Sequence, residues 1–143
     1  MVAPAPRVEA TSQGQSRVKN GITFDTGALI ALERRSQRAR HVLERATEQK
    51  VRITVPAAVL TEWWRSRTDI RDRILPAVRV EPLSESLAKL AGEALAVTKG
   101  ATSIDAIVMA SAAQRGDVVY TADIADLTKL AGYFRTVRVL GIG

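Results

Sequence analysis

Four acidic residues stand where a carboxylate can do chemistry. They are Asp25 at the end of the apolar run "ITFD", Glu62 in "LTEWW", Asp105 in "SIDAIV" and Asp123 at the end of "VVYTAD". Mg²⁺ and Mn²⁺ prefer carboxylate oxygens and bind phosphate oxygens at the same time. Carboxylates packed together without a cation would repel each other and raise one another's pKa values. If these acids meet in space, they therefore predict a divalent metal centre that hydrolyses phosphodiester bonds.

The elements that would position these acids alternate along the chain. Strand-like runs cover residues 22–25, 51–55, 78–83, 117–123 and 137–140, and helical patterns lie between them, including 102–116 and about 124–131. This alternation predicts an α/β fold, a three-layer α/β/α sandwich with a central parallel sheet. Sites in open parallel sheets form beyond the carboxyl ends of the strands. We expect Asp25 and Asp123 at that edge, with Asp105 alongside and Glu62 on a helix that passes over it.

The composition favours one globular domain with an anionic partner. The chain has 143 residues and a net charge of +6, which favours a partner such as nucleic acid. Residues 1–20 read as a flexible arm or an expression remnant, and residues 21–143 as a single nuclease-like domain. The chain has no cysteine and one histidine, His41, which excludes thiol catalysis and catalysis by an imidazole pair. It shows no membrane-spanning run and no secretory signal, and we expect a cytoplasmic protein.

Each acid also has a purely structural interpretation. Asp25 and Asp123 can cap the helices that follow them, Asp105 fits a capping box that begins at Thr102, and Glu62 can be a solvated helix residue. The stretch "FDTGALIAL" also reads like the loop of an aspartic protease, but Asp-Thr-Gly occurs once and helical patterns follow it. A phosphatase with Asp25 as nucleophile would need a second Asp at position 27, where the chain has Gly.

Three blocks carry a resemblance to a known family. They are "FDTGALIALE" (24–33), "VPAAVLTEWWR" (55–65) and "SIDAIVMASAAQRGDVVYTADIADL" (103–127), followed by the terminal "VRVL" strand. The sequence resembles the PIN-domain nucleases, in particular the VapC-type toxins of toxin–antitoxin pairs, over roughly residues 21–142. The resemblance implies an α/β/α sandwich and a Mg²⁺- or Mn²⁺-dependent ribonuclease.

The resemblance also implies roles for single residues. Asp25, Glu62, Asp105 and Asp123 match the acidic quartet of the family. Within it, Asp25, Asp105 and Asp123 are expected to hold metal, and Glu62 and Asp123 match acids that bind a second ion or hold water beside it. Thr26, Thr121 and Asp126 are expected to support these acids.

A second group of side chains is expected to contact RNA or a partner protein. It comprises Arg34, Arg35, Arg38, Trp63, Trp64 and Arg65. Stacking of bases on tryptophan and phosphate contacts from arginine are the interactions in question. Adjacent helix positions point about 100° apart, so we expect one tryptophan to be buried and the other to lie at a rim or an interface.

The function expected from the sequence is a metal-dependent endoribonuclease that acts as the toxin of a toxin–antitoxin pair. Its expected partners are an RNA substrate, a cognate antitoxin protein and a second copy in a homodimer, and no membrane. The alternative is an RNA- or partner-binding module that keeps a PIN-like fold and cleaves nothing. An intact set of acids argues against the alternative, because a pure binder gains little from repelling carboxylates at an RNA site.

Overall fold

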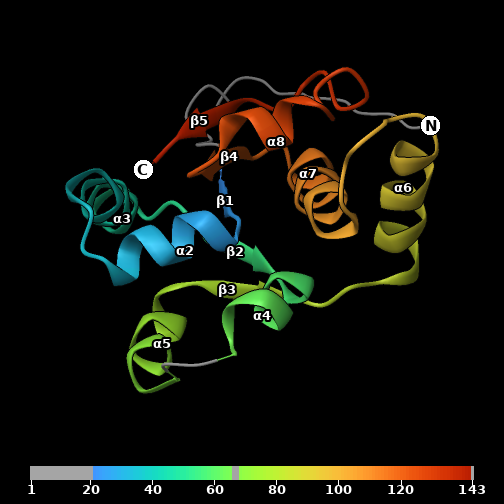
Figure 1. The fold of residues 1–143 in the computed structure, drawn as a ribbon. Helices are drawn as coiled ribbons and strands as arrows, with labels where there is room; N and C mark the ends of the chain where they lie inside the picture. The colour runs from blue at the N-terminus through green and yellow to red at the C-terminus, as the bar shows by residue number, and fades with distance from the viewer. Residues whose placement is uncertain (1–20, 66–67, 143) are drawn as a thin grey trace.

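A parallel sheet forms the centre of the molecule (Figure 1), seen here in a computed structural model that describes residues 21–65 and 68–142. The strands are β1 (Ile22–Phe24), β2 (Ile53–Pro56), β3 (Arg79–Glu81), β4 (Val118–Thr121) and β5 (Val139–Gly141). Their order is β3-β2-β1-β4-β5, and every neighbouring pair is parallel. The carboxyl ends of all five strands therefore meet at one edge. The arm expected over residues 1–20 lies outside the described residues.

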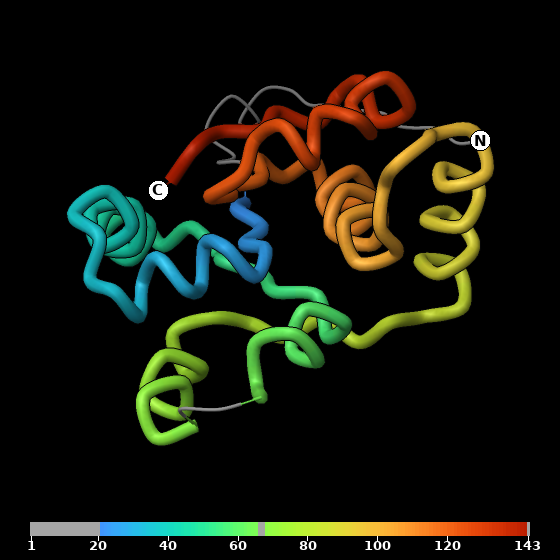
Figure 2. The backbone as a smooth tube through the Cα atoms, in the orientation of Figure 1, coloured from blue at the N-terminus to red at the C-terminus, as the bar shows by residue number. Residues whose placement is uncertain are grey.

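Helices cover both faces of this sheet. They are α2 (Thr26–Glu33), α3 (Gln37–Gln49), α4 (Ala57–Trp63), α5 (Thr68–Ile74), α6 (Glu85–Ala96), α7 (Ser103–Arg115) and α8 (Ile124–Thr128), with a 3₁₀ turn η2 (Leu75–Ala77). Helices α2 and α3 lie on one side of the strands and α7 on the other, and α6 packs outside α7 (Figures 1 and 2). No helix within the described residues is long and apolar enough to cross a membrane.

The observed layers confirm the predicted α/β/α fold. All five predicted strands are present, each shorter than its sequence run. The helix predicted over 102–116 spans Ser103–Arg115, and Gly116 follows it at φ 77°, a conformation that glycine adopts without steric cost. The sequence patterns did not indicate α5. Few apolar residues mark it, and a contact from its charged Arg71 anchors it instead.

The core is built from small aliphatic side chains rather than aromatic ones. Helix α7 shows this most clearly, because every residue from Ala106 to Ala112 is buried. A helix that is apolar on all sides is one packed on all sides. Its alanines allow the sheet and α6 to approach it from opposite directions, and this fixes its first turn, which carries Asp105.

A buried polar contact ties α5 to α2 and α4. Arg71 forms an ion pair with Glu33 at side-chain exposures of 10% and 13%, and it also donates to the backbone carbonyl of Trp63. The indole Nε1 of Trp63 donates to Glu33 Oε2 at 2.7 Å, and the Arg71 guanidinium stands 5.7 Å from the indole centroid. Charges this far from water need such complete pairing. The contact fixes the helix that carries Glu62.

Removing one partner of this contact should destabilise the fold strongly. We expect Arg71→Met to lower the free energy of unfolding by about 3 kcal/mol, because the largely buried Glu33 carboxylate would lose its cationic partner. The matched control is Lys89→Met, which breaks the Lys89–Glu85 pair at exposures of 70% and 80%. That loss should be below about 0.5 kcal/mol. Urea unfolding measures both, and equal losses would contradict the role of Arg71.

Candidate active site

Asp25 is the most constrained of the acids. It follows β1 and caps α2, where its Oδ1 accepts the N–H of Ala28 at 2.9 Å. Its Oδ2 accepts the hydroxyl of Thr121, the last residue of β4, at 2.5 Å. Burial raises the pKa of the Asp25 carboxyl above its ordinary value. The two hydrogen bonds offset part of this rise, and the charge of Asp105 adds to it.

Asp105 is the acid on which the other charges act. It lies in the first turn of α7, and its N–H donates to the hydroxyl of the capping Thr102 at 3.1 Å. Burial is the main cause that raises its pKa, and a separate interaction of the Thr102 hydroxyl with the carboxyl group lowers it. The charges of Asp126, Glu62 and Asp123 raise it further. Acids from two separate segments, α4 and the start of α8, therefore lie close enough to α7 to act on the Asp105 carboxyl group.

Glu62 reaches this edge from α4. Its Oε1 accepts the hydroxyl of Thr26 at 2.5 Å, which joins α4 to the first residue of α2. The Thr26 hydroxyl therefore orients the Glu62 carboxylate. Glu62 itself is exposed, so its other oxygen remains open to solvent or to a ligand.

Thr121 organises the far side of the same edge. Besides donating to Asp25, its Oγ1 accepts the N–H of Asp123 at 3.0 Å. Asp123 caps α8, and its Oδ1 accepts the N–H of Asp126 at 3.4 Å. Asp126 also lies 3.7 Å from Lys129 in an exposed ion pair. One threonine thus sets the relative positions of a buried acid and an exposed one.

Gly27 permits the close approach of the two corners. A Cβ at Gly27 would lie 2.9 Å from the Cβ and 3.2 Å from the N of Ala122, in the turn that follows β4. Both distances are shorter than ordinary van der Waals contact. The glycine therefore lets the start of α2 come close enough for Asp25 to reach Thr121.

The acids fit a hard divalent cation by their chemistry. Within residues 21–65 and 68–142, no group of three or more Asp, Glu or His side chains is arranged so as to hold a metal ion. Mg²⁺ commonly takes only one or two protein carboxylates and completes its shell with water and phosphate oxygens. Asp25 and Asp105 have raised pKa values, so a nearby positive charge would favour their ionised forms.

The arginine cluster predicted as an RNA contact lies away from the acids. Arg34 and Arg35 follow α2, so about 12 Å of helix separates them from Asp25. Arg38 is exposed in the first turn of α3, and His41 is exposed on the same helix. A contact between these arginines and the anion that the acids handle would need a ligand long enough to span α2.

The two tryptophans divide as their spacing predicts. Trp63 is fully buried and Trp64 is 36% exposed, with their rings edge to face at 5.9 Å. Trp63 therefore belongs to the core and offers no surface for stacking, which is a correction to its expected place among the contact residues. Trp64 and the exposed Arg65 keep that expectation.

The sequence matches the PIN domain family over residues 22–132. The chain belongs to the PIN domain family. This is a family of nuclease type whose members generally use divalent metals. The match contains all four acids together with Thr26, Thr121 and Asp126. No curated protein sequence is similar enough to the chain to count as a match.

Solved structures share the fold of this PIN domain. One is VapBC2 from Rickettsia felis bound to a DNA fragment from their promoter, with TM-score 0.67, 12% identity and coverage of 85% of this chain and 98% of that one. Another is FitAB bound to an IR36 DNA fragment, with TM-score 0.62, 20% identity and coverages of 84% and 94%. FitAcB from Neisseria gonorrhoeae gives TM-score 0.62, 19% identity and coverages of 83% and 96%. At these identities the likeness concerns the fold alone.

Sequence reasoning missed two features that shape the PIN domain. The contact of Gly27 with Ala122 joins segments that are far apart in the sequence, and no local pattern signals it. Arginines at the opposite, amino edge of the sheet were also missed. Their signal was present, because Arg52 and Thr54 alternate with apolar residues in "VRITV" and so share one face of the strand.

Gly27→Ala should test the close approach of the two corners. Alanine normally stabilises a helix by about 1 kcal/mol over glycine. Here we expect destabilisation by about 1–3 kcal/mol, because the new Cβ meets Ala122. The control is Gly92→Ala in α6, where an added Cβ meets nothing within 4 Å, and it should stabilise the protein. Urea unfolding measures both, and stabilisation by Gly27→Ala would contradict the contact.

The raised pKa of Asp105 predicts a pH-dependent stability. The folded protein binds this proton more tightly than the unfolded chain, so the ionised carboxylate destabilises the fold at neutral pH. The penalty disappears as the pH falls through the raised pKa toward the ordinary value of 3.8. In EDTA at pH 7, we expect Asp105→Asn to raise the melting temperature by a few degrees, and the gain should shrink toward pH 4. The exposed control Glu93→Gln should show neither effect, and a gain independent of pH would contradict this account.

Proposed function

We propose that this PIN domain is a Mg²⁺- or Mn²⁺-dependent endoribonuclease and the toxin of a toxin–antitoxin pair. The observation that carries the proposal is the electrostatic grouping of Glu62, Asp123 and Asp126 around Asp105, which in turn acts on Asp25. Repulsion within such a group of carboxylates destabilises a fold unless a bound cation compensates their charge. Family membership supports the nuclease class, and the net charge of +6 supports a polyanionic substrate.

The protein's own contribution is to hold carboxylates ready for a cation. Asp25 and Asp105 would be the principal ligands, and Asp123 would complete the set expected from the sequence by holding water beside the ion. Thr121 and the Ala28 N–H orient Asp25. The bound ion would neutralise charge on the phosphodiester and lower the pKa of the attacking water.

The remaining acids would act on water and substrate. Glu62 would accept a proton from a water at the scissile phosphate, a role supported by its exposure and by its hydrogen bond with Thr26. Asp126 adds negative charge at the rim. Trp64 and Arg65 would contact RNA bases and phosphates, and the arginines after α2 would hold more distant phosphates.

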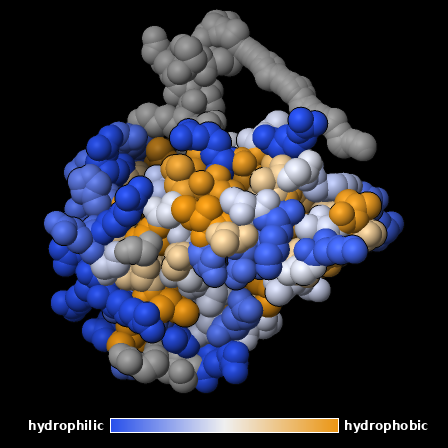
Figure 3. All heavy atoms as spheres, turned by 45° about the horizontal axis from the view of Figure 1, so that its top comes forward, coloured by the Kyte–Doolittle hydropathy of each residue, from blue (hydrophilic) through white to orange (hydrophobic). Residues whose placement is uncertain are grey.

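Partners follow from the same proposal. VapBC2 and FitAB are similar in fold, and their structures were determined with promoter or IR36 DNA. We infer by analogy that an antitoxin covers the acidic edge of this chain. Exposed large hydrophobic residues would support a protein partner or a homodimer; they are Trp64, Leu83, Val97, Ile124 and Tyr133. Hydrophobic patches among hydrophilic residues are visible on the face drawn in Figure 3.

Neutralising single acids should abolish cleavage while the fold survives. We expect Asp25→Asn and Asp105→Asn each to reduce cleavage of single-stranded RNA by roughly a hundredfold or more. EDTA should do the same to the wild type. Mn²⁺ should raise the melting temperature of the wild type and not of Asp25→Asn, which reports metal binding without relying on activity.

The exposed variant Glu93→Gln is the matched control and should cleave as the wild type does. Cleavage that survives both EDTA and Asp25→Asn would rule out the metal-dependent mechanism. The toxin assignment is tested by growth after induced expression, where the wild type should arrest growth and an equally expressed Asp25→Asn should not. Equal growth of the two strains would contradict the toxin role.

The second candidate is an RNA- or partner-binding module that cleaves nothing. It is favoured by the fact that the described acids form no complete ligand group of three. RNA binding by the wild type, with no cleavage and no response of stability to Mg²⁺ or Mn²⁺, would select this candidate.

A further inference from the structure

A second candidate site lies at the amino edge of the sheet, opposite the acids. A pocket of about 860 Å³ opens there, between the first residues of the strands, the end of α3 and the end of α7. This volume falls in the range of small-molecule sites. The pocket is lined by four positive side chains, from Lys50, Arg52, Arg79 and Arg115, against one carboxylate, from Asp117.

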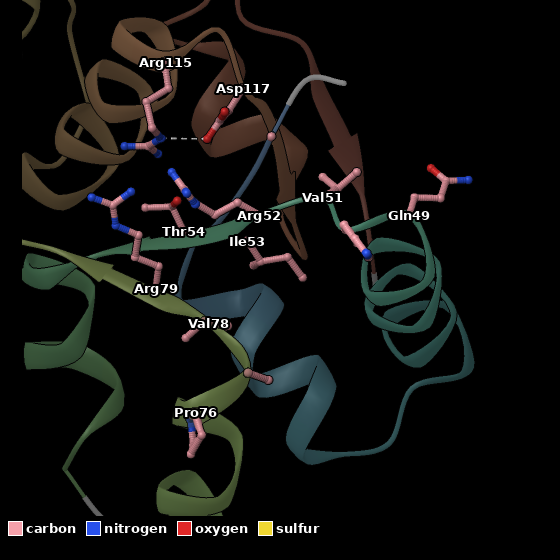
Figure 4. A pocket seen from close by; sticks show the side chains of 13 residues that line it. Gln49, Val51, Arg52, Ile53, Thr54, Pro76, Val78, Arg79, Arg115 and Asp117 are labelled. Atoms are coloured by element: carbon pink, nitrogen blue, oxygen red, sulfur yellow. Dashed lines mark hydrogen bonds and ion pairs between the residues drawn. The ribbon is translucent and has the colours of Figure 1, made fainter. Parts of the chain in front are cut away.

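The strand register places the polar side chains of this pocket on one face. Thr54 pairs with Thr23 on one side and with Arg79 on the other, and paired residues of parallel strands share a face. Arg52 shares that face because it lies two residues before Thr54. Arg115 reaches the same face from α7 and donates to the Thr23 hydroxyl at 2.7 Å. Figure 4 shows Thr54 between Arg52 and Arg79, with Arg115 above them.

Of these arginines, Arg115 is the one held in place. Its Nε lies 2.9 Å from Asp117, and its Nη1 lies 2.8 Å from Glu81. That second contact is an ion pair without hydrogen-bond geometry, because the buried Nη1 has no hydrogen-bond partner. Among the described residues, the exposed side chains of Arg52 and Arg79 form no hydrogen bond or ion pair. Two uncompensated guanidinium groups therefore stand beside a rigidly placed third.

Thr54 provides an independent sign of a ligand. Its residue is 2% exposed, and its hydroxyl has no hydrogen-bond partner among the described residues. Buried hydroxyl groups in folded proteins nearly always have a partner. A hydroxyl without one, on the wall of a cationic pocket, fits a site whose acceptor comes from a bound anion.

We propose that this pocket binds a phosphate monoester, with the phosphate held by Arg52, Thr54 and Arg79 beside the fixed Arg115. A phosphate offers three terminal oxygens and about two charges, which suits several donors that come from neighbouring strands. A carboxylate would leave some of these donors unpaired. Val51, Pro76 and Val78 line the rest of the pocket and provide an apolar surface for the esterified group. The site is separate from the acidic edge.

The test measures binding of inorganic phosphate and of 5′-AMP to the full chain by equilibrium dialysis. EDTA is present to keep metal out of the acidic edge, and potassium chloride holds the ionic strength constant. We expect saturable binding that Arg79→Gln weakens about tenfold and Thr54→Val weakens severalfold. If 5′-AMP binds more tightly than inorganic phosphate, the apolar surface contributes to binding. If the two bind equally, the phosphate group alone is recognised.

Two controls separate this site from general attraction and from the acids. Arg38→Gln removes an exposed arginine elsewhere and should leave the affinity within about twofold. Asp25→Asn should also leave it unchanged, so failure of the nuclease proposal does not affect this result. Thr54→Val is nearly isosteric, and its melting temperature without phosphate should equal or exceed that of the wild type. The proposal is wrong if neither ligand binds saturably, if Arg38→Gln weakens binding as much as Arg79→Gln, or if Thr54→Val has no effect on it.

Discussion

The hydrogen bond from Thr121 to Asp25 joins the central strand β1 to its neighbour β4 at the edge where the acids gather. It links the end of β1 to the end of β4 and is almost entirely shielded from water. Burial opposes the ionised form of Asp25, whereas this bond and the one from the Ala28 N–H favour it. The absence of a side chain at Gly27 makes the approach possible. These two hydrogen bonds thus hold the Asp25 carboxylate in place although its burial opposes ionisation. The other acids lie at the same edge of the sheet.

In this fold an acidic residue can cap a helix and also belong to the candidate active site. A strand of a parallel sheet ends where the next helix begins, so an acid at that corner lies at a helix N-terminus. Asp25 caps α2, Asp123 caps α8, and Asp105 stands in the first turn of α7. The N-termini of three helices therefore direct partial positive charge at the same edge, which favours negative charge there. The structural interpretation of each acid explains how the group of acids is tolerated.

The parts of this structure that follow local patterns were predictable, and the parts that depend on distant contacts were not. Alternating apolar runs gave the strands, and the parallel topology then brought their carboxyl ends together. The hydrogen bond between Thr26 and Glu62 and the approach of Gly27 to Ala122 join segments that no periodicity relates. The sequence pattern did not indicate helix α5, because a buried ion pair rather than an apolar stripe holds this helix against the rest of the protein. Helix geometry predicted that one of the two adjacent tryptophans would be buried, but it did not predict that the buried one would be Trp63.

Helix α7 connects the two charged ends of the molecule. It carries Asp105 in its first turn and Arg115 in its last, the order that the helix dipole favours. Its 13 residues span about 20 Å, so the acidic edge and the basic pocket lie on opposite ends of one rigid, buried element. Ser111 and Arg115 both contact Glu81 on β3, which fixes α7 at its basic end. Because α7 is packed on all sides, a change in the contacts of Arg115 that shifts the helix along its axis would also move Asp105 relative to Asp25. The acidic edge and the basic pocket therefore differ in chemistry, but the position of each depends on the same helix, α7.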